Sequence, residues 1–139
     1  MMEPVFDNIE TIRFILGDQL NHDHSWYLEK DEHTMYVVAE IFEEATYTRH
    51  HVQKVHAFFL AMEAFATMLK EAGHQVLYLT LDDTAGASSA SELLNVLADT
   101  YNPIRVGYQR PDEHRLLEQL RALALSGVEV IEYDTEHFM

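Results

Sequence analysis

The feature that most constrains the fold is a regular alternation of apolar runs with helix-like segments. Five short runs are rich in β-branched and aromatic residues, the composition typical of buried strands. A helix-like segment precedes each of the last three runs. Such alternation indicates a parallel sheet with helices on both faces, joined by right-handed crossovers. The predicted fold class is therefore α/β, a three-layer, Rossmann-like, five-stranded parallel sheet.

Hydrophobic spacing gives the expected bounds of the elements. The predicted strands cover residues 12–16, 35–41, 74–81, 104–108 and 128–133. The predicted helices cover residues 52–72, 92–101 and 111–127, the first because its apolar residues recur at spacings of three and four. Ser91 is the expected N-cap of the second helix, and Gly73 the expected C-cap glycine of the first. Residues 22–34 are expected to form a polar loop with room for one helical turn.

Polar residues follow the first strand directly. The apolar run at residues 12–16 ends in Gly17, and Asp18 and Gln19 come next. Ligands of open α/β sheets bind outside the carboxyl ends of the strands, and glycine lets the backbone approach a ligand closely. Asp18 and Gln19 offer hydrogen-bond acceptors and donors. The alternative interpretation is an ordinary turn, since Gly-Asp is common turn chemistry.

Acidic residues also follow the other predicted strands. Glu40 lies near the end of the second strand, and Glu43 and Glu44 come soon after it. In a parallel sheet the same edge would also gather Asp82, Asp83 and Arg110. Carboxylates there can accept hydrogen bonds from the ring N–H groups of a heterocycle or from sugar-like hydroxyls. The alternative is that Glu43 and Glu44 are solvated loop acids, since Asp and Glu are mostly exposed.

Length and charge restrict the class of protein. The chain has 139 residues, which suits one domain; we expect a lead-in over residues 1–10 and the domain over residues 11–139. Its formal net charge is −15, which opposes direct binding to nucleic acid because such binding depends on Lys and Arg. No apolar run is long enough to span a bilayer, and the acidic N-terminus does not resemble a secretory signal. We expect a cytoplasmic protein with no membrane partner.

Motifs for metal, phosphate and nucleophilic chemistry are lacking. Four histidines lie near predicted loops, but their spacing matches no known ligand motif; they are His22, His24, His50 and His51. No phosphate-binding glycine loop and no serine nucleophile elbow is present. The chain has no cysteine, which excludes cysteine-ligated zinc and all-thiolate iron–sulfur clusters from it. We therefore predict no metal site and no catalytic residue in this chain.

Three motifs in a fixed order carry a resemblance to a known family. They are LGDQL at Leu16–Leu20, AEIFEEATYTRHHVQK at Ala39–Lys54 and PDEHR at Pro111–Arg115. With these motifs the chain resembles the N-terminal antenna domain of the deoxyribodipyrimidine photolyase-related family, the iron–sulfur bacterial cryptochromes and prokaryotic (6-4) photolyases. The resemblance extends over nearly the whole chain. It implies a photolyase N-terminal domain-like α/β fold.

The resemblance also implies a ligand. Antenna domains of this family bind 6,7-dimethyl-8-ribityllumazine, which passes excitation energy to a flavin. By position in the motifs, Gly17, Asp18 and Gln19 would line the chromophore pocket. Glu44 would hold the lumazine with Tyr47 near it, and Glu40 is a further candidate. The implied function is light harvesting for light-dependent DNA repair or blue-light signalling.

The rest of the family architecture is expected outside this chain. In the family a C-terminal catalytic domain holds FAD and a 4Fe-4S cluster and contacts DNA, so the parent protein would be a photolyase-like lyase and flavoprotein. The 139 residues alone, an isolated domain, are not expected to be catalytic. The alternative is a free-standing nucleotide- or flavin-binding α/β module, and a third reading is an interaction domain with an empty pocket. Cysteines and a long helical extension in the downstream reading frame would exclude the free-standing module.

Overall fold

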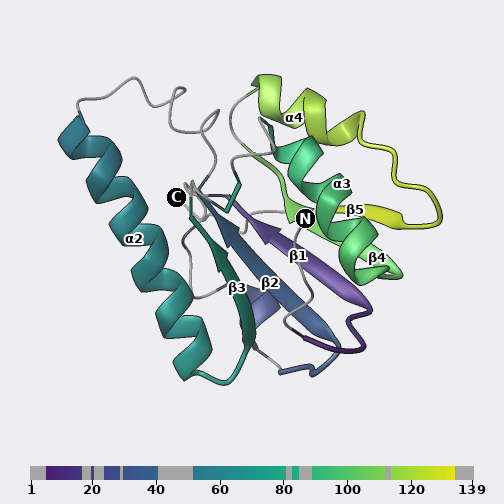
Figure 1. Cartoon of the computed structure of the whole chain (residues 1–139), viewed down its shortest axis with the longest axis horizontal. Helices are drawn as coiled ribbons and strands as arrows, with labels where there is room; N and C mark the ends of the chain where they lie inside the picture. The colour runs from purple at the N-terminus through teal and green to yellow at the C-terminus, as the bar shows by residue number, and fades with distance from the viewer. Residues whose placement is uncertain are drawn as a thin grey trace.

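The five strands form a single parallel sheet. The computed structural model describes residues 6–16, 20, 24–28, 30–40, 52–80, 83–84, 89–111 and 114–133, with the backbone alone for residues 52–56 and 58. The strands are β1 (Thr11–Ile15), β2 (Thr34–Ala39), β3 (Gln75–Leu79), β4 (Arg105–Gln109) and β5 (Glu129–Tyr133). Their order across the sheet is β3-β2-β1-β4-β5, and every pair is parallel (Figure 1). The α/β prediction is confirmed.

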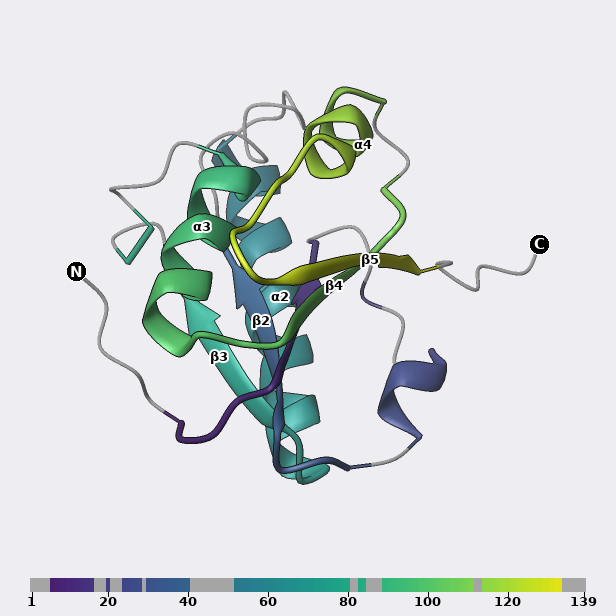
Figure 2. The same cartoon turned by 90° about the vertical axis from the view of Figure 1, so that its right-hand side faces the viewer.

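Helices cover both faces of this sheet. They are the 3-10 helix η1 (Ser25–Tyr27) and the α-helices α2 (Val52–Glu71), α3 (Ala90–Tyr101) and α4 (His114–Arg121). Figure 2 shows α2 on one side of the strands and α3 on the other. Among the described residues, no helix has both the length and the apolarity needed to cross a membrane.

An aliphatic core joins the sheet to α3 and α4. Alternate residues of β1, β2 and β4 point toward this face, as the two-residue period of a strand requires. They pack against α3 and α4 in one cluster, whose most buried members include Ile12, Phe14, Met35, Val37, Leu93, Leu94, Leu97, Val106 and Leu120. The loop after α4 adds Leu123 and Leu125, both partly buried. This face therefore has the close-packed interior expected of an α/β domain.

The opposite face has an aromatic core that includes one arginine. Trp26 of η1 packs beside Tyr36 of β2, and the neighbouring Tyr27 packs beside Phe65 of α2. The Arg13 guanidinium of β1 lies 5.3 Å from the centroid of the Trp26 ring, and its Nη1 donates to the Tyr36 hydroxyl over 2.9 Å and to the Trp26 carbonyl over 3.2 Å. Cation–π contact and hydrogen bonds offset the cost of taking this charge partly out of water. Arg13 thus attaches η1, which lies between β1 and β2 in the sequence, to the sheet.

The caps explain where the helices begin and end. Gly73 has φ +101°, the left-handed conformation expected after α2. Asn102 closes α3 with φ 48°. The N-cap of α3 is Ser89, whose hydroxyl accepts from the Glu92 N–H over 3.2 Å, so the prediction of Ser91 is wrong by two residues. Helix α4 also ends earlier than predicted, at Arg121. Its last turn tightens through a hydrogen bond from the Leu123 N–H to the Leu120 carbonyl.

Removing one buried side chain of α3 should measure the contribution of the aliphatic core. Leu97 is fully buried, whereas its neighbour Val96 is 36% exposed. We expect Leu97→Ala to lower the free energy of unfolding by about 2–5 kcal/mol, and Val96→Ala to change it by less than about 0.5 kcal/mol. Urea unfolding followed by circular dichroism measures both. Equal effects of the two variants would contradict this packing of α3.

Candidate functional site

The strand order places a topological switch point at the middle of the sheet. Strand β1 pairs with β2 on one side and with β4 on the other. The connection after β1 runs through η1 on one face, and the connection after β4 runs through α4 on the other. In open α/β sheets, ligands bind outside the carboxyl ends of the strands at such a point. The switch point therefore lies between β1 and β4, and the carboxyl edge at β1, next to the residues that follow β2, is the candidate site.

Most of the predicted site residues lie outside the described part of the chain. These are Gly17, Asp18, Gln19, Glu43, Glu44, Tyr47 and Asp82. Their assignment stays a prediction from the sequence and its family resemblance. Glu40 is described, and it directly follows β2, which ends at Ala39 and not at residue 41 as predicted.

Glu40 is fixed by three hydrogen bonds to residues on or after β3. Its backbone N–H donates to the Leu79 carbonyl over 2.8 Å. Its carbonyl accepts from the Thr84 hydroxyl over 2.7 Å, and Thr84 is buried, with 3% of its surface exposed. Its carboxylate accepts from the Tyr78 hydroxyl. Both the backbone and the side chain of this acid are therefore held at the carboxyl edge.

Tyr78 connects this acid to helix α2. The Tyr78 hydroxyl oxygen lies 3.2 Å from the Phe59 carbonyl oxygen of α2, while its hydrogen bond reaches Glu40. Burial, the bond to Glu40 and the nearby negative charges of Glu40 and Glu63 all raise the pKa of Tyr78 above its usual value. The tyrosine therefore remains a neutral donor throughout the physiological pH range.

The sequence did not identify Tyr78 or Thr84 as site residues. Tyr78 belongs to the alternating pattern of a strand, which reveals the face of the sheet but not the partner of the hydroxyl group. Thr84 is 44 residues away from Glu40 in the sequence. Asp83, predicted at this edge, bonds to the residue that directly follows β3: its Oδ2 accepts from the Thr80 N–H over 2.9 Å and from the Thr80 hydroxyl over 3.0 Å.

The other end of the carboxyl edge is stabilised by a separate network. The Arg110 N–H donates to the Tyr133 carbonyl over 2.8 Å, which joins the ends of β4 and β5. Glu132 of β5 accepts from the Tyr108 hydroxyl over 3.0 Å and from Arg121 of α4 over 2.8 Å. Burial and the bond to Glu132 raise the pKa of Tyr108 to about 12. This network attaches α4 to β5, and we assign it a structural role.

One of the four histidines considered for a metal has a structural role. His24, one of the four considered for a metal, caps η1: its Nδ1 accepts from the Trp26 N–H over 3.1 Å. His22, His50 and His51 fall outside the described residues. Within the described ranges, no three His, Asp or Glu side chains are placed to hold a metal ion.

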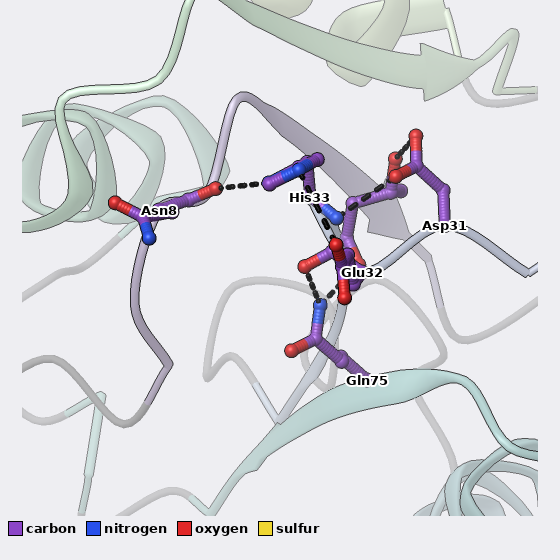
Figure 3. Close-up of polar contacts among 6 residues, drawn as sticks. Asn8, Asp31, Glu32, His33 and Gln75 are labelled. Atoms are coloured by element: carbon purple, nitrogen blue, oxygen red, sulfur yellow. Dashed lines mark hydrogen bonds and ion pairs between the residues drawn. The ribbon is translucent and has the colours of Figure 1, made fainter.

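A hollow of about 540 Å³ opens at the amino edge of the sheet, away from the predicted site, and is lined in part by Lys30, Glu32 and Gln75. Figure 3 shows its polar contacts. The His33 Nδ1 donates to the Asn8 carbonyl over 3.0 Å, which raises the pKa of His33 above its usual value. The Gln75 side-chain amide donates to the Glu32 carbonyl. These bonds join three segments of the chain, so we assign them a structural role.

Comparison with known proteins identifies a family and a relative that match most of the chain. A family model described as "Deoxyribodipyrimidine photo-lyase-related protein" matches residues 13–139. A (6-4) photolyase of Agrobacterium fabrum (strain C58 / ATCC 33970) is 32% identical over 112 residues. The match covers 79% of this chain and 22% of the relative. The chain thus spans about a fifth of the length of that photolyase.

The hydrogen bond from the Thr84 hydroxyl to the Glu40 carbonyl can be tested by mutation. Thr84→Val removes the donor to the Glu40 carbonyl while it keeps the shape of the side chain. We expect the free energy of unfolding to fall by about 1–2 kcal/mol, because a carbonyl loses its partner. Thr100→Val, which removes a helix-surface bond to the Val96 carbonyl, is the control and should cost less than about 0.5 kcal/mol. Unchanged urea unfolding of Thr84→Val would contradict a role for this bond in holding Glu40.

The Glu132 network predicts a pH dependence of stability. The hydrogen bond and charge of Arg121 hold the pKa of Glu132 below its usual value. Its contribution is therefore present above the unfolded-state pKa, near 4.3, and is lost as the pH falls through the lower folded-state pKa.

Glu132→Gln should thus lower stability at pH 7 by at most about 1 kcal/mol, because the pair is partly exposed. The variant should also lose less stability than the wild type between pH 5 and pH 3. Thermal unfolding across this range measures the difference, with Glu129→Gln on the same strand as control. Parallel pH profiles for wild type and Glu132→Gln would refute the assignment.

Proposed function

The chain belongs to the deoxyribodipyrimidine photo-lyase-related protein family, and from this we propose that it is the light-harvesting antenna domain of a photolyase- or cryptochrome-related flavoprotein. Two further observations support the proposal. The fold is an α/β sheet with a switch point beside β1. The chain corresponds to about a fifth of a (6-4) photolyase, so most of the relative's length has no counterpart in these residues.

The proposed ligand is 6,7-dimethyl-8-ribityllumazine, bound at the carboxyl edge of β1 and β2. Once bound, this group would absorb blue light and pass the excitation energy to a flavin. Gly17, Asp18 and Gln19 would line the pocket after β1. Glu40, Glu44 and Tyr47 would line it after β2, with the acids accepting hydrogen bonds from the ligand.

The observation that carries this proposal is the register of β1 against β2. Ile15, the last residue of β1, pairs with Val38, the penultimate residue of β2. Parallel neighbours in this register end at the same edge of the sheet, so the chain leaves β1 at Leu16 close to where it leaves β2 at Glu40. The anchored Glu40 carboxylate fits a ligand that presents N–H or O–H donors.

The redox cofactors would belong to a different part of the parent protein. This chain has no cysteine to ligate a 4Fe-4S cluster. Its sequence also has no obvious FAD-binding motif. We propose that both groups, and the contact with DNA, reside in a C-terminal catalytic domain. The formal charge of −15 agrees with a domain that meets DNA only through that partner.

Titration with the lumazine tests the proposal, with two adjacent acids as a matched pair. We expect the ligand to show a red-shifted absorption band and quenched fluorescence on binding to the purified chain. Glu44→Gln should weaken binding about tenfold or more, because a charge-assisted hydrogen bond contributes about 1.5–3 kcal/mol. Glu43→Gln removes the same charge one residue away and should bind within about twofold of the wild type.

Two results would count against the proposal. A wild-type chain that leaves the lumazine spectrum unchanged would remove the chromophore from this domain. Equal losses in Glu43→Gln and Glu44→Gln would show that the acids act only through their overall negative charge.

A further inference from the structure

We infer that Tyr78 is a positioning residue of the proposed chromophore site, which holds the Glu40 carboxylate in the orientation that binds the ligand. The inference rests on the proposed function and names a residue outside the set predicted from sequence. It starts from the way Glu40 is held. Backbone bonds to Leu79 and from Thr84 place the residue, while the hydroxyl of Tyr78 acts on its side chain.

The chemistry of the donor matters for a carboxylate that binds a ligand. A lysine or arginine at position 78 would orient Glu40 but would also cancel its charge. The Tyr78 hydroxyl is neutral, so it orients the carboxylate and leaves the negative charge in place. A carboxylate has two oxygens and about four acceptor sites, so the bond from Tyr78 is compatible with a further bond from a ligand N–H.

The position of Tyr78 is itself fixed by two elements. It belongs to β3, where it pairs with Val38 of β2, and its hydroxyl oxygen lies 3.2 Å from the Phe59 carbonyl oxygen of α2. A residue held by both the sheet and the helix loses little further freedom when a ligand binds. Pre-organisation of this kind increases affinity because fewer side chains must be ordered on binding.

Another tyrosine in the same sheet provides a matched control. Tyr108 of β4 donates to Glu132 of the neighbouring strand over 3.0 Å, as Tyr78 of β3 donates to Glu40 after β2. The Tyr108 pair lies on the opposite face of the sheet, beside α4. Removing either hydroxyl makes the same chemical change, but only the Tyr78 hydroxyl bonds to a proposed ligand-binding acid.

The experiment compares Tyr78→Phe, Tyr108→Phe and the wild type in lumazine titrations of the purified chain. We expect the dissociation constant to rise about tenfold in Tyr78→Phe, because the Glu40 side chain must then be ordered by the ligand. At saturation its bound lumazine should also absorb closer to the wavelength of the free ligand. Tyr108→Phe should match the wild type in both measurements, although its stability falls.

A double-mutant cycle tests whether Tyr78 acts through Glu40. In a Glu40→Gln background the further change Tyr78→Phe should weaken binding by less than about twofold, since the partner is already altered. If Tyr78→Phe does not fold, as judged by circular dichroism, the Glu40→Gln variant alone decides: wild-type affinity in that variant would overturn the inference.

The outcomes separate the two proposals. If the wild type binds no lumazine, the proposed function fails and the role of Tyr78 fails with it. If the wild type binds and Tyr78→Phe equals Tyr108→Phe in affinity and absorption, the inference about Tyr78 alone fails. Loss of affinity without any change in the absorption of the bound ligand would also overturn it, because a general loss of stability explains that result.

Discussion

The parallel pairing of β1 with β2 and β4 determines where every other part of this domain can lie. β1 is the central strand, and four of its five residues are buried. The connections after β1 and β4 run on opposite faces, which creates the switch point between these two strands at the carboxyl edge. The residues proposed to bind the chromophore follow β1 and β2, so a changed strand order would separate them.

The two faces of the sheet bury different kinds of side chain. The face under α3 and α4 is mainly aliphatic and close-packed. The face under α2 and η1 has a cluster of aromatic rings around Arg13, which holds Trp26 and Tyr36 through its guanidinium group. The connection between β1 and β2 contains only a single helical turn among its described residues, and this cluster fixes that turn. The described turn between β1 and β2, the two strands that the proposed site residues follow, is thereby attached to the sheet.

Local patterns predicted the elements, and contacts between distant residues determined the details. Alternation and helical spacing were sufficient for the five-stranded sheet and for α2, since these signals depend on neighbours in the sequence. Ser89 and Ser91 both lie just before the first apolar residues of the same helix, so composition alone could not choose the N-cap. The bonds of Thr84 and Tyr78 to Glu40 join residues about 40 positions apart, which no single-sequence pattern reveals. Glu40 was predicted at this edge from the strand pattern and again from the family resemblance, whereas its hydrogen bonds to Tyr78 and Thr84 are visible only in the structure.

A crystal structure of the chain with 6,7-dimethyl-8-ribityllumazine tests the central claim most directly, namely that the ends of β1 and β2 form one chromophore site. The account predicts that the ring system lies at the carboxyl edge of these strands. A carboxylate from Glu40 or Glu44 and one from Asp18 should both be within hydrogen-bond distance of the ligand. A ligand bound instead in the hollow at the amino edge, or Asp18 and Glu44 on opposite sides of the molecule, would contradict it.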